Sequence, residues 1–274
     1  MDKKDYLDNL HQWQACSHPE LTNSIPEELF EGDFSEKYKR LHDNLWRRIT
    51  RAHGTLDTLE QLEQFPFEYI YPLNKMEFWR LVFKNFLDTV CLLLHGLMSD
   101  TGKDVHSIPS FKNEIMNKNN WLRPERWDLL NQELKERKFD AEVDSIADRV
   151  TKIRTNLIAH HLIDKQSGNP KESLTGVSLV ELRRLFEATH SLFGALSFGS
   201  AYVTLAGDLM PGTVGGQPTR TCLDEVLDAV LKDSYVVNQP ERRGEWWPMD
   251  RKYMVEEELQ MMNKLRKRIG LPEA

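Results

Sequence analysis

The sequence predicts an all-α protein, a bundle of about four long helices with a helical arm before it and a helical appendage after it. Apolar residues recur at spacings of three and four from Phe34 onward, which is the period of an α-helix. No segment alternates apolar and polar residues for long enough to indicate a sheet. We therefore expect an arm over 1–33, a bundle over 34–206 and an appendage over 207–274.

The arm and the first two long helices follow from composition and spacing. Asp2–Ala15 predicts a short amphipathic helix, and prolines break the sequence after it. Ser35–Gln64 has apolar residues at helical spacing, with Gly54 as a possible break between two helices. Asn74–Met98 predicts the most apolar helix, which should run through the core.

Helix start signals mark the remaining bundle elements. Ser110 is expected to cap a short helix through Asn117, and Pro124, a favoured first-turn residue, to start another through Lys138. A long helix is expected over Asp140–His161. The capping box Ser178-Leu-Val-Glu181 opens the last long helix, which continues toward Tyr202.

The pattern changes after Gly207, where we expect the appendage to begin. Glycine and proline mark 211–218 as a loop, and two weaker helices are expected over Thr221–Lys232 and Arg251–Ile269.

Charge and cysteine usage narrow the class of protein. The net charge of −7 excludes a protein that coats nucleic acid generally, so any contact with RNA must be local. Cys16, Cys91 and Cys222 are far apart and show neither zinc-site nor disulfide spacing, which favours a reducing, cytoplasmic compartment. The polar start predicts no signal peptide. Charged or polar residues interrupt the most apolar stretch, so no membrane contact is expected.

One helix carries residues suited to chemistry. At about 100° per residue, Arg154 falls on the same face as the apolar residues Val143 and Val150. A guanidinium facing a core is costly unless it is paired, so either a carboxylate on a neighbouring helix or a functional interface should meet it.

The segment Arg154-Thr-Asn-Leu-Ile-Ala-His160-His161 resembles the motif of the HEPN superfamily, an Arg followed after four to six residues by a His. The likeness is to its abortive-infection (AbiU-like) branch, and it extends to Lys75-Met-Glu-Phe-Trp79 and to Ser178-Leu-Val-Glu-Leu182, covering about Tyr71 to Phe198.

The resemblance implies a homodimer that cuts single-stranded RNA or a tRNA loop without a metal or cofactor, as a phage-defence or toxin effector restrained by an antitoxin or triggered by an activating partner. The implied catalytic residues are Arg154, a histidine and Asn156. A histidine can transfer protons near neutral pH, and an arginine can hold the phosphate as negative charge builds. The products would carry a 2′,3′-cyclic phosphate and a 5′-hydroxyl.

The sequence leaves several alternatives open. The resemblance selects His160, whereas ideal helical phase aligns His161 with Arg154. Many HEPN proteins carry Asn, Asp or His directly after the Arg, and Thr155 here favours a non-catalytic helical dimer that binds RNA or a partner protein. His160, His161 and Asp164 are an alternative metal site.

Two basic clusters, Arg47-Arg48-Arg51 and Lys264–Arg268, are either guides for RNA or solvated helix faces. His95, His106 and His190 are expected to be isolated core or surface histidines.

Overall fold

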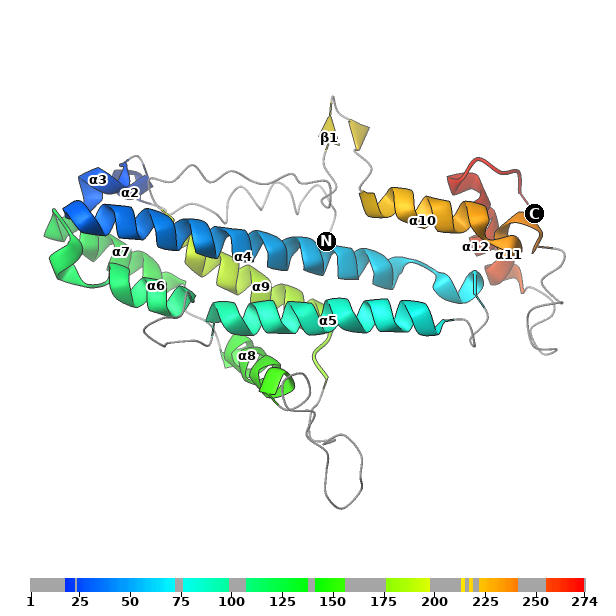
Figure 1. The fold of residues 1–274 in the computed structure, drawn as a ribbon, viewed down its shortest axis with the longest axis horizontal. Coiled ribbons are helices and arrows are strands. Elements are labelled where there is room, and N and C mark those ends of the chain that lie inside the picture. Colours follow the sequence, from blue (N-terminus) through cyan, green and yellow to red (C-terminus); the bar gives the residue numbers. More distant parts are fainter. Residues whose placement is uncertain are drawn as a thin grey trace, which may run out of the picture. The chain divides into compact units, whose positions relative to one another are not determined.

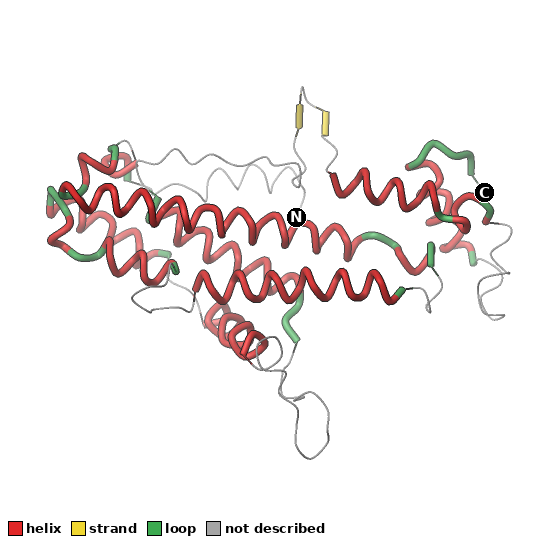
Figure 2. The backbone as a smooth tube through the Cα atoms, in the orientation of Figure 1, coloured by secondary structure: helices red, strands yellow, loops and turns green. Residues whose placement is uncertain are grey.

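The computed structural model is mostly helical, which confirms the all-α class (Figures 1 and 2). It describes residues 18–22, 24–71, 76–98, 107–137, 141–155, 176–197, 213–214, 217–218, 222–240 and 255–273. Within these ranges the strands are β1 (Thr213–Val214) and β2 (Gln217–Pro218), which pair antiparallel inside the segment expected to be a loop. The helix predicted over Asp2–Ala15 lies outside the described residues.

The helices and turns follow one another along the chain as α2 (Pro19–Thr22), α3 (Pro26–Leu29), α4 (Gly32–Gln64), η1 (Phe67–Tyr69), α5 (Glu77–Met98), α6 (Ile108–Ile115), η3 (Lys118–Asn120), α7 (Pro124–Glu136), α8 (Ala141–Ile153), α9 (Leu179–Ala195), α10 (Cys222–Asp233), α11 (Tyr235–Asn238) and α12 (Glu256–Arg268). Pro124 does start a helix, and Ser178 does cap one.

Two local details differ from the sequence-based expectation. Gly54 does not break α4, which is one helix of 33 residues. Gly54 is buried, so tertiary packing outweighs the roughly 1 kcal/mol by which glycine disfavours a helix. The cap of α6 is Ser107, whose Oγ accepts a hydrogen bond of 3.2 Å from the backbone N–H of Ser110.

The chain divides into two compact units. The first unit consists of Met1–Leu56 and Asp88–Leu205, and the second unit consists of Asp57–Leu87 and Ala206–Ala274. The unit boundaries fall inside α4 and α5, so each of these helices contributes residues to both units.

The first unit has an aromatic core around α4. The ring of Tyr38 lies 5.1 Å from that of Phe30 and 5.4 Å from that of Phe111, centroid to centroid. The Tyr38 hydroxyl donates a hydrogen bond of 2.9 Å to the carbonyl oxygen of Leu196, just after α9. This contact joins residues 158 positions apart and seats α9 against α4.

The second unit has its own core, to which α4, η1, α10, α11 and α12 contribute. Its buried residues are Leu62, Phe65, Phe67, Ile70, Leu227, Leu231, Val236, Val237, Met262 and Leu265. Arg266 is buried beside this core and donates hydrogen bonds to the carbonyl oxygens of Val237, at 2.5 Å, and Pro272, at 2.6 Å. Arg268 forms an ion pair of 2.6 Å with Asp228. Two cations of the basic cluster Lys264–Arg268 therefore hold the unit together rather than forming a solvated face.

Helix α5 is unusually apolar for its exposure. Among the described residues it is the one helix whose length and composition would allow it to span a membrane, although only 22% of its most apolar window is buried. A single helix of this kind is weak evidence for a membrane span, because core helices of globular proteins pass the same test. Phe78 and Leu81 are 64% and 58% exposed on it.

Candidate functional site

The candidate site begins where α8 ends. Val143, Ile146 and Val150 are buried along one side of α8, as its spacing predicts. Arg154 follows Val150 by four residues and is half-buried. The helix does not simply stop at Ile153, because Arg154 and Thr155 form a π-helical turn. Such turns are rare and often occur at functional sites.

Arg154 has no ion-pair or hydrogen-bond partner among the residues that the structure describes. Arginines on neighbouring stretches of the same unit differ from it. Arg137 pairs with the buried Glu133 at 2.5 Å, and Arg149 pairs with Glu181 at 2.5 Å. The carboxylate partner that a buried arginine would need is thus present for these two but absent, within the described ranges, for Arg154.

The other predicted catalytic residues, Asn156, His160 and His161, and the alternative metal ligand Asp164 lie outside the described residues. The π-helical turn nevertheless bears on the choice of histidine. The alignment of His161 with Arg154 assumed an ideal α-helix, and a wider turn changes the angle between successive residues. The ideal α-helix on which that alignment depended therefore does not hold at Arg154 itself.

A histidine that was expected to be isolated lies beside α8. Nδ1 of His95, on α5, is within 3.3 Å of Oγ1 of Thr151, one turn before Arg154. Both side chains are half-buried. The sequence offers no signal for this contact, because it joins residues 56 positions apart.

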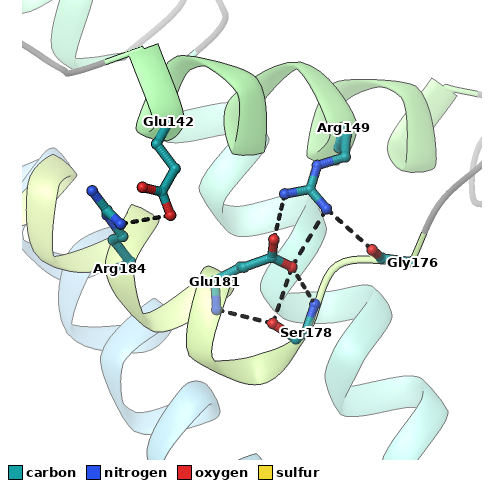
Figure 3. A network of polar contacts seen from close by, with 6 residues as sticks. All are labelled: Glu142, Arg149, Gly176, Ser178, Glu181 and Arg184. Atoms are coloured by element: carbon teal, nitrogen blue, oxygen red, sulfur yellow. Dashed lines mark hydrogen bonds and ion pairs between the residues drawn. The ribbon is translucent and has the colours of Figure 1, made fainter.

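An ion pair fixes the start of α9 against α8 (Figure 3). The Arg149 guanidinium donates to both carboxylate oxygens of Glu181, at 2.5 and 3.4 Å, and to the carbonyl oxygen of Gly176, at 3.3 Å. Glu181 also accepts 2.8 Å and 3.0 Å hydrogen bonds from the backbone N–H and hydroxyl of Ser178.

These contacts strongly favour the ionised form of the Glu181 carboxyl group. The hydrogen bond from Arg149, and next the backbone N–H of Ser178, lower the pKa of the carboxyl group to about 2. A second pair, between Arg184 and Glu142 at 2.6 Å, joins the same two helices at a more exposed position (Figure 3). Sequence reasoning found Glu181 as a capping residue and missed its partner on another helix.

Two further described histidines, His53 and His190, pack against an aromatic ring of the first unit. The rings of His53 and His190 both stack on Phe186, with centroids 5.0 Å and 5.6 Å from that of its ring. His190 is buried, as expected of a core histidine. His106 lies outside the described residues. Within the ranges that the structure describes, no three His, Cys, Asp or Glu side chains are grouped to hold a metal ion.

The fold and site define an all-α protein with a half-buried arginine at the end of a helix, unpaired within the part of the chain that the structure describes. Comparison with family models, with curated proteins and with solved structures finds no match to this chain. The likeness to HEPN domains therefore rests on the chain's own residues.

Proposed function

We propose that the chain is a metal-independent endoribonuclease of the HEPN type, acting as a homodimer on single-stranded RNA or tRNA loops. Arg154 binds the reacting phosphate, and His160 or His161 transfers the proton. Asn156 orients the histidine ring or the phosphate. The role proposed for the protein is that of a phage-defence or toxin effector in the cytoplasm.

The observation that carries this proposal is the state of Arg154. It is half-buried at a π-helical turn and has no carboxylate partner in the described part of the chain. A guanidinium kept partly from water without a counter-ion is costly, with penalties of up to several kcal/mol per fully buried ion. A phosphate group would remove this cost, because the planar guanidinium fork donates two parallel hydrogen bonds to it.

The proposed chemistry uses only side chains. A neutral imidazole takes the proton of the ribose 2′-hydroxyl, whose oxygen attacks the adjacent phosphorus, and an imidazolium protonates the 5′-oxygen as its bond to phosphorus breaks. Arg154 stays charged throughout and stabilises the negative charge on the phosphate oxygens in the transition state. The products carry a 2′,3′-cyclic phosphate and a 5′-hydroxyl, and DNA should resist because it lacks the attacking group.

The test is incubation of the purified full chain with total RNA and with tRNA in excess EDTA, followed by end-group analysis. We expect wild-type protein to produce cyclic-phosphate ends, and Arg154→Ala, His160→Ala or His161→Ala to show which residues are needed. Lys152→Ala is the matched control, since Lys152 is an exposed cation two residues from Arg154, and its loss should leave cutting unchanged. Arg154→Lys should lose most of the activity, because an ammonium keeps the charge without the fork.

Other outcomes would count against the proposal. Equal cutting by wild type and Arg154→Ala would show that another site, or a contaminant, cleaves the RNA. A shift of RNA in a gel without any shortening would instead support the non-catalytic binding protein that Thr155 favours.

A further inference from the structure

The structure changes which arginines of α4 face solvent together. The sequence grouped Arg47, Arg48 and Arg51 as one cluster, but Arg48 is half-buried with its guanidinium against α5. A Cβ atom added at Gly96 would overlap Nη2 of Arg48. Arg48 thus belongs to the contact between these two helices within the first unit.

Three other arginines lie along the outer face of α4. Arg40, Arg47 and Arg51 are exposed, and so is Asn44 between them. At about 100° per residue, these four positions fall within roughly 60° of one another, opposite the buried Tyr38, Leu45, Ile49 and Leu56. Arg51 follows Arg40 by eleven positions, which corresponds to roughly 16 Å along the helix. We call Arg40, Arg47 and Arg51 the arginine stripe.

The stripe has no acidic partner among the described residues, whereas nearby cations do. Lys37 pairs with Glu114 at 2.8 Å, and Lys39 pairs with Glu27 and with Glu36. Asp43 lies at the edge of the stripe with a carboxylate oxygen 3.7 Å from Nδ1 of His42. Burial lowers the pKa of His42, so this is a contact with a neutral ring and not an ion pair. Glu27, Glu36 and Glu114 are therefore paired with lysines, and no described carboxylate pairs with the arginines of the stripe.

This arrangement disfavours the helix slightly. Arg47 and Arg51 are like charges four residues apart, which destabilise a helix by about 0.2–0.5 kcal/mol. The chain as a whole is acidic, with a net charge of −7, so the stripe is a local exception and not part of a generally basic surface.

We propose that the arginine stripe binds the phosphate backbone of single-stranded RNA. This inference rests on the proposed function, since it gives that enzyme a surface to hold its substrate away from the reacting phosphate. Arginine suits the task because its planar fork donates two parallel hydrogen bonds to a phosphate group. Asn44, in line with the arginines, adds an amide that can hydrogen-bond to sugar or phosphate oxygens.

Binding is tested with a fluorescently labelled single-stranded 2′-O-methyl RNA, which cannot be cut by attack of the 2′-oxygen. The variant is Arg40→Gln/Arg47→Gln/Arg51→Gln in the full chain. The control is Lys135→Gln/Lys232→Gln/Lys267→Gln, which removes the same charge from exposed positions on three other helices. Thermal unfolding should show the stripe variant to be as stable as wild type or more so.

The expected result is a change in salt dependence. Each phosphate contact on a single strand contributes about 0.7 to the slope of log affinity against log salt, so loss of three contacts should reduce the slope by about 2. Between about 50 and 200 mM salt, wild type should lose roughly 20-fold more affinity than the stripe variant does. The control variant should keep most of the wild-type slope.

Three results would overturn the proposal: no binding of this RNA by wild type, equal slopes for wild type and stripe variant, or equal losses in the two triple variants. If the stripe binds an acidic protein instead, wild type should not bind this RNA.

The cleavage assay distinguishes failure of this proposal from failure of the proposed nuclease activity. Wild type that binds through the stripe but leaves RNA whole would contradict only the nuclease, and a stripe variant with unchanged KM on cleavable RNA would contradict only the stripe.

Discussion

Thr50, on α4, has a buried hydroxyl oxygen with no hydrogen-bond partner in the described part of the chain. Leaving a buried polar group unpaired costs about 1–3 kcal/mol, whereas replacing it with an apolar group of the same shape removes the cost. We expect Thr50→Val to raise the free energy of unfolding by about 1 kcal/mol, measured by chemical denaturation. Thr50→Ser keeps the hydroxyl and loses the methyl group, so it should not stabilise. A loss of stability in Thr50→Val would mean that the hydroxyl is paired.

His53 and His190 make the stability of the first unit depend on pH. Burial, and next the charge of Arg183, lower the pKa of His53 to about 3. Burial and then the neighbouring His53 lower the pKa of His190 to about 3. The folded protein therefore holds both rings neutral, while the unfolded chain binds protons below about pH 6.5.

The sign follows from this difference. Above pH 6.5 both states hold neutral rings and the histidines have no effect, but as pH falls from 6.5 toward 3 the unfolded state gains protons and stability is lost. Between pH 7.5 and pH 5 we expect a loss of about 2 kcal/mol for each histidine, measured by chemical denaturation. His53→Phe/His190→Phe keeps rings against Phe186 and should show a smaller loss between the same two pH values. An undiminished loss would assign the dependence to other groups.

At the scale of elements, the ion pair between Arg149 and Glu181 joins α8 to α9. The Arg149 side chain is 25% exposed and that of Glu181 is 31% exposed, and the pair is bidentate. A double-mutant cycle of Arg149→Met and Glu181→Gln should give a coupling of about 1–2 kcal/mol in the free energy of unfolding. Glutamine at position 181 retains the capping box, so the cycle reports the contact between the helices.

The pair between Arg184 and Glu142 is the control for that cycle. It joins the same two helices but is 42% and 61% exposed, so solvent screens it and its coupling should be about 0–0.5 kcal/mol. Equal couplings for the two pairs would show that shielding does not determine their strength. The Arg149 pair should also weaken as pH falls below about 4.5 toward 2, because protonation of Glu181 removes its charge.

The elements that the sequence predicted well are those with local signals. Pro124 and the Ser178 capping box depend on residues within one helical turn, and both start helices in the structure. The predictions of a helix break at Gly54 and of a cap at Ser110 were wrong. Burial of Gly54 keeps α4 continuous, and the extended backbone at Ser107 makes that residue the cap of α6. The π-helical turn at Arg154 and Thr155 has no local signal in the sequence.

At the scale of the molecule, long-range contacts decide what no spacing reveals. Asp57–Leu87 groups with the C-terminal residues because its apolar side chains share a core with those of α10 to α12. For the candidate site, the sequence found Arg154 from its place on an apolar helix face. It missed the contact of His95 with Thr151 and that of Arg149 with Glu181, because each joins separate helices.

Separate cores predict separate local unfolding. Leu231→Ala removes a fully buried side chain from the second unit and should destabilise it by about 2–5 kcal/mol. Hydrogen exchange should then speed up for amides of α10 and α12, while those of α9 in the first unit stay protected. Leu185→Ala, at a fully buried position of α9, should give the reverse pattern. Faster exchange in both units after either change would show that they unfold as one.

A shared dimeric site makes cutting depend on the concentration of the chain. If two copies must associate, the cleavage rate per chain should rise with concentration and level off once nearly all chains are dimeric. Light scattering should then give twice the mass of the chain over the same range of concentration. Arg154→Ala should still dimerise, so an excess of it mixed with wild type should trap active chains in mixed dimers and suppress cutting. An equal excess of Lys152→Ala should not suppress it, since that variant is expected to be active. A constant rate per chain together with a monomer's mass would contradict a composite site and leave Arg154 to act within one chain.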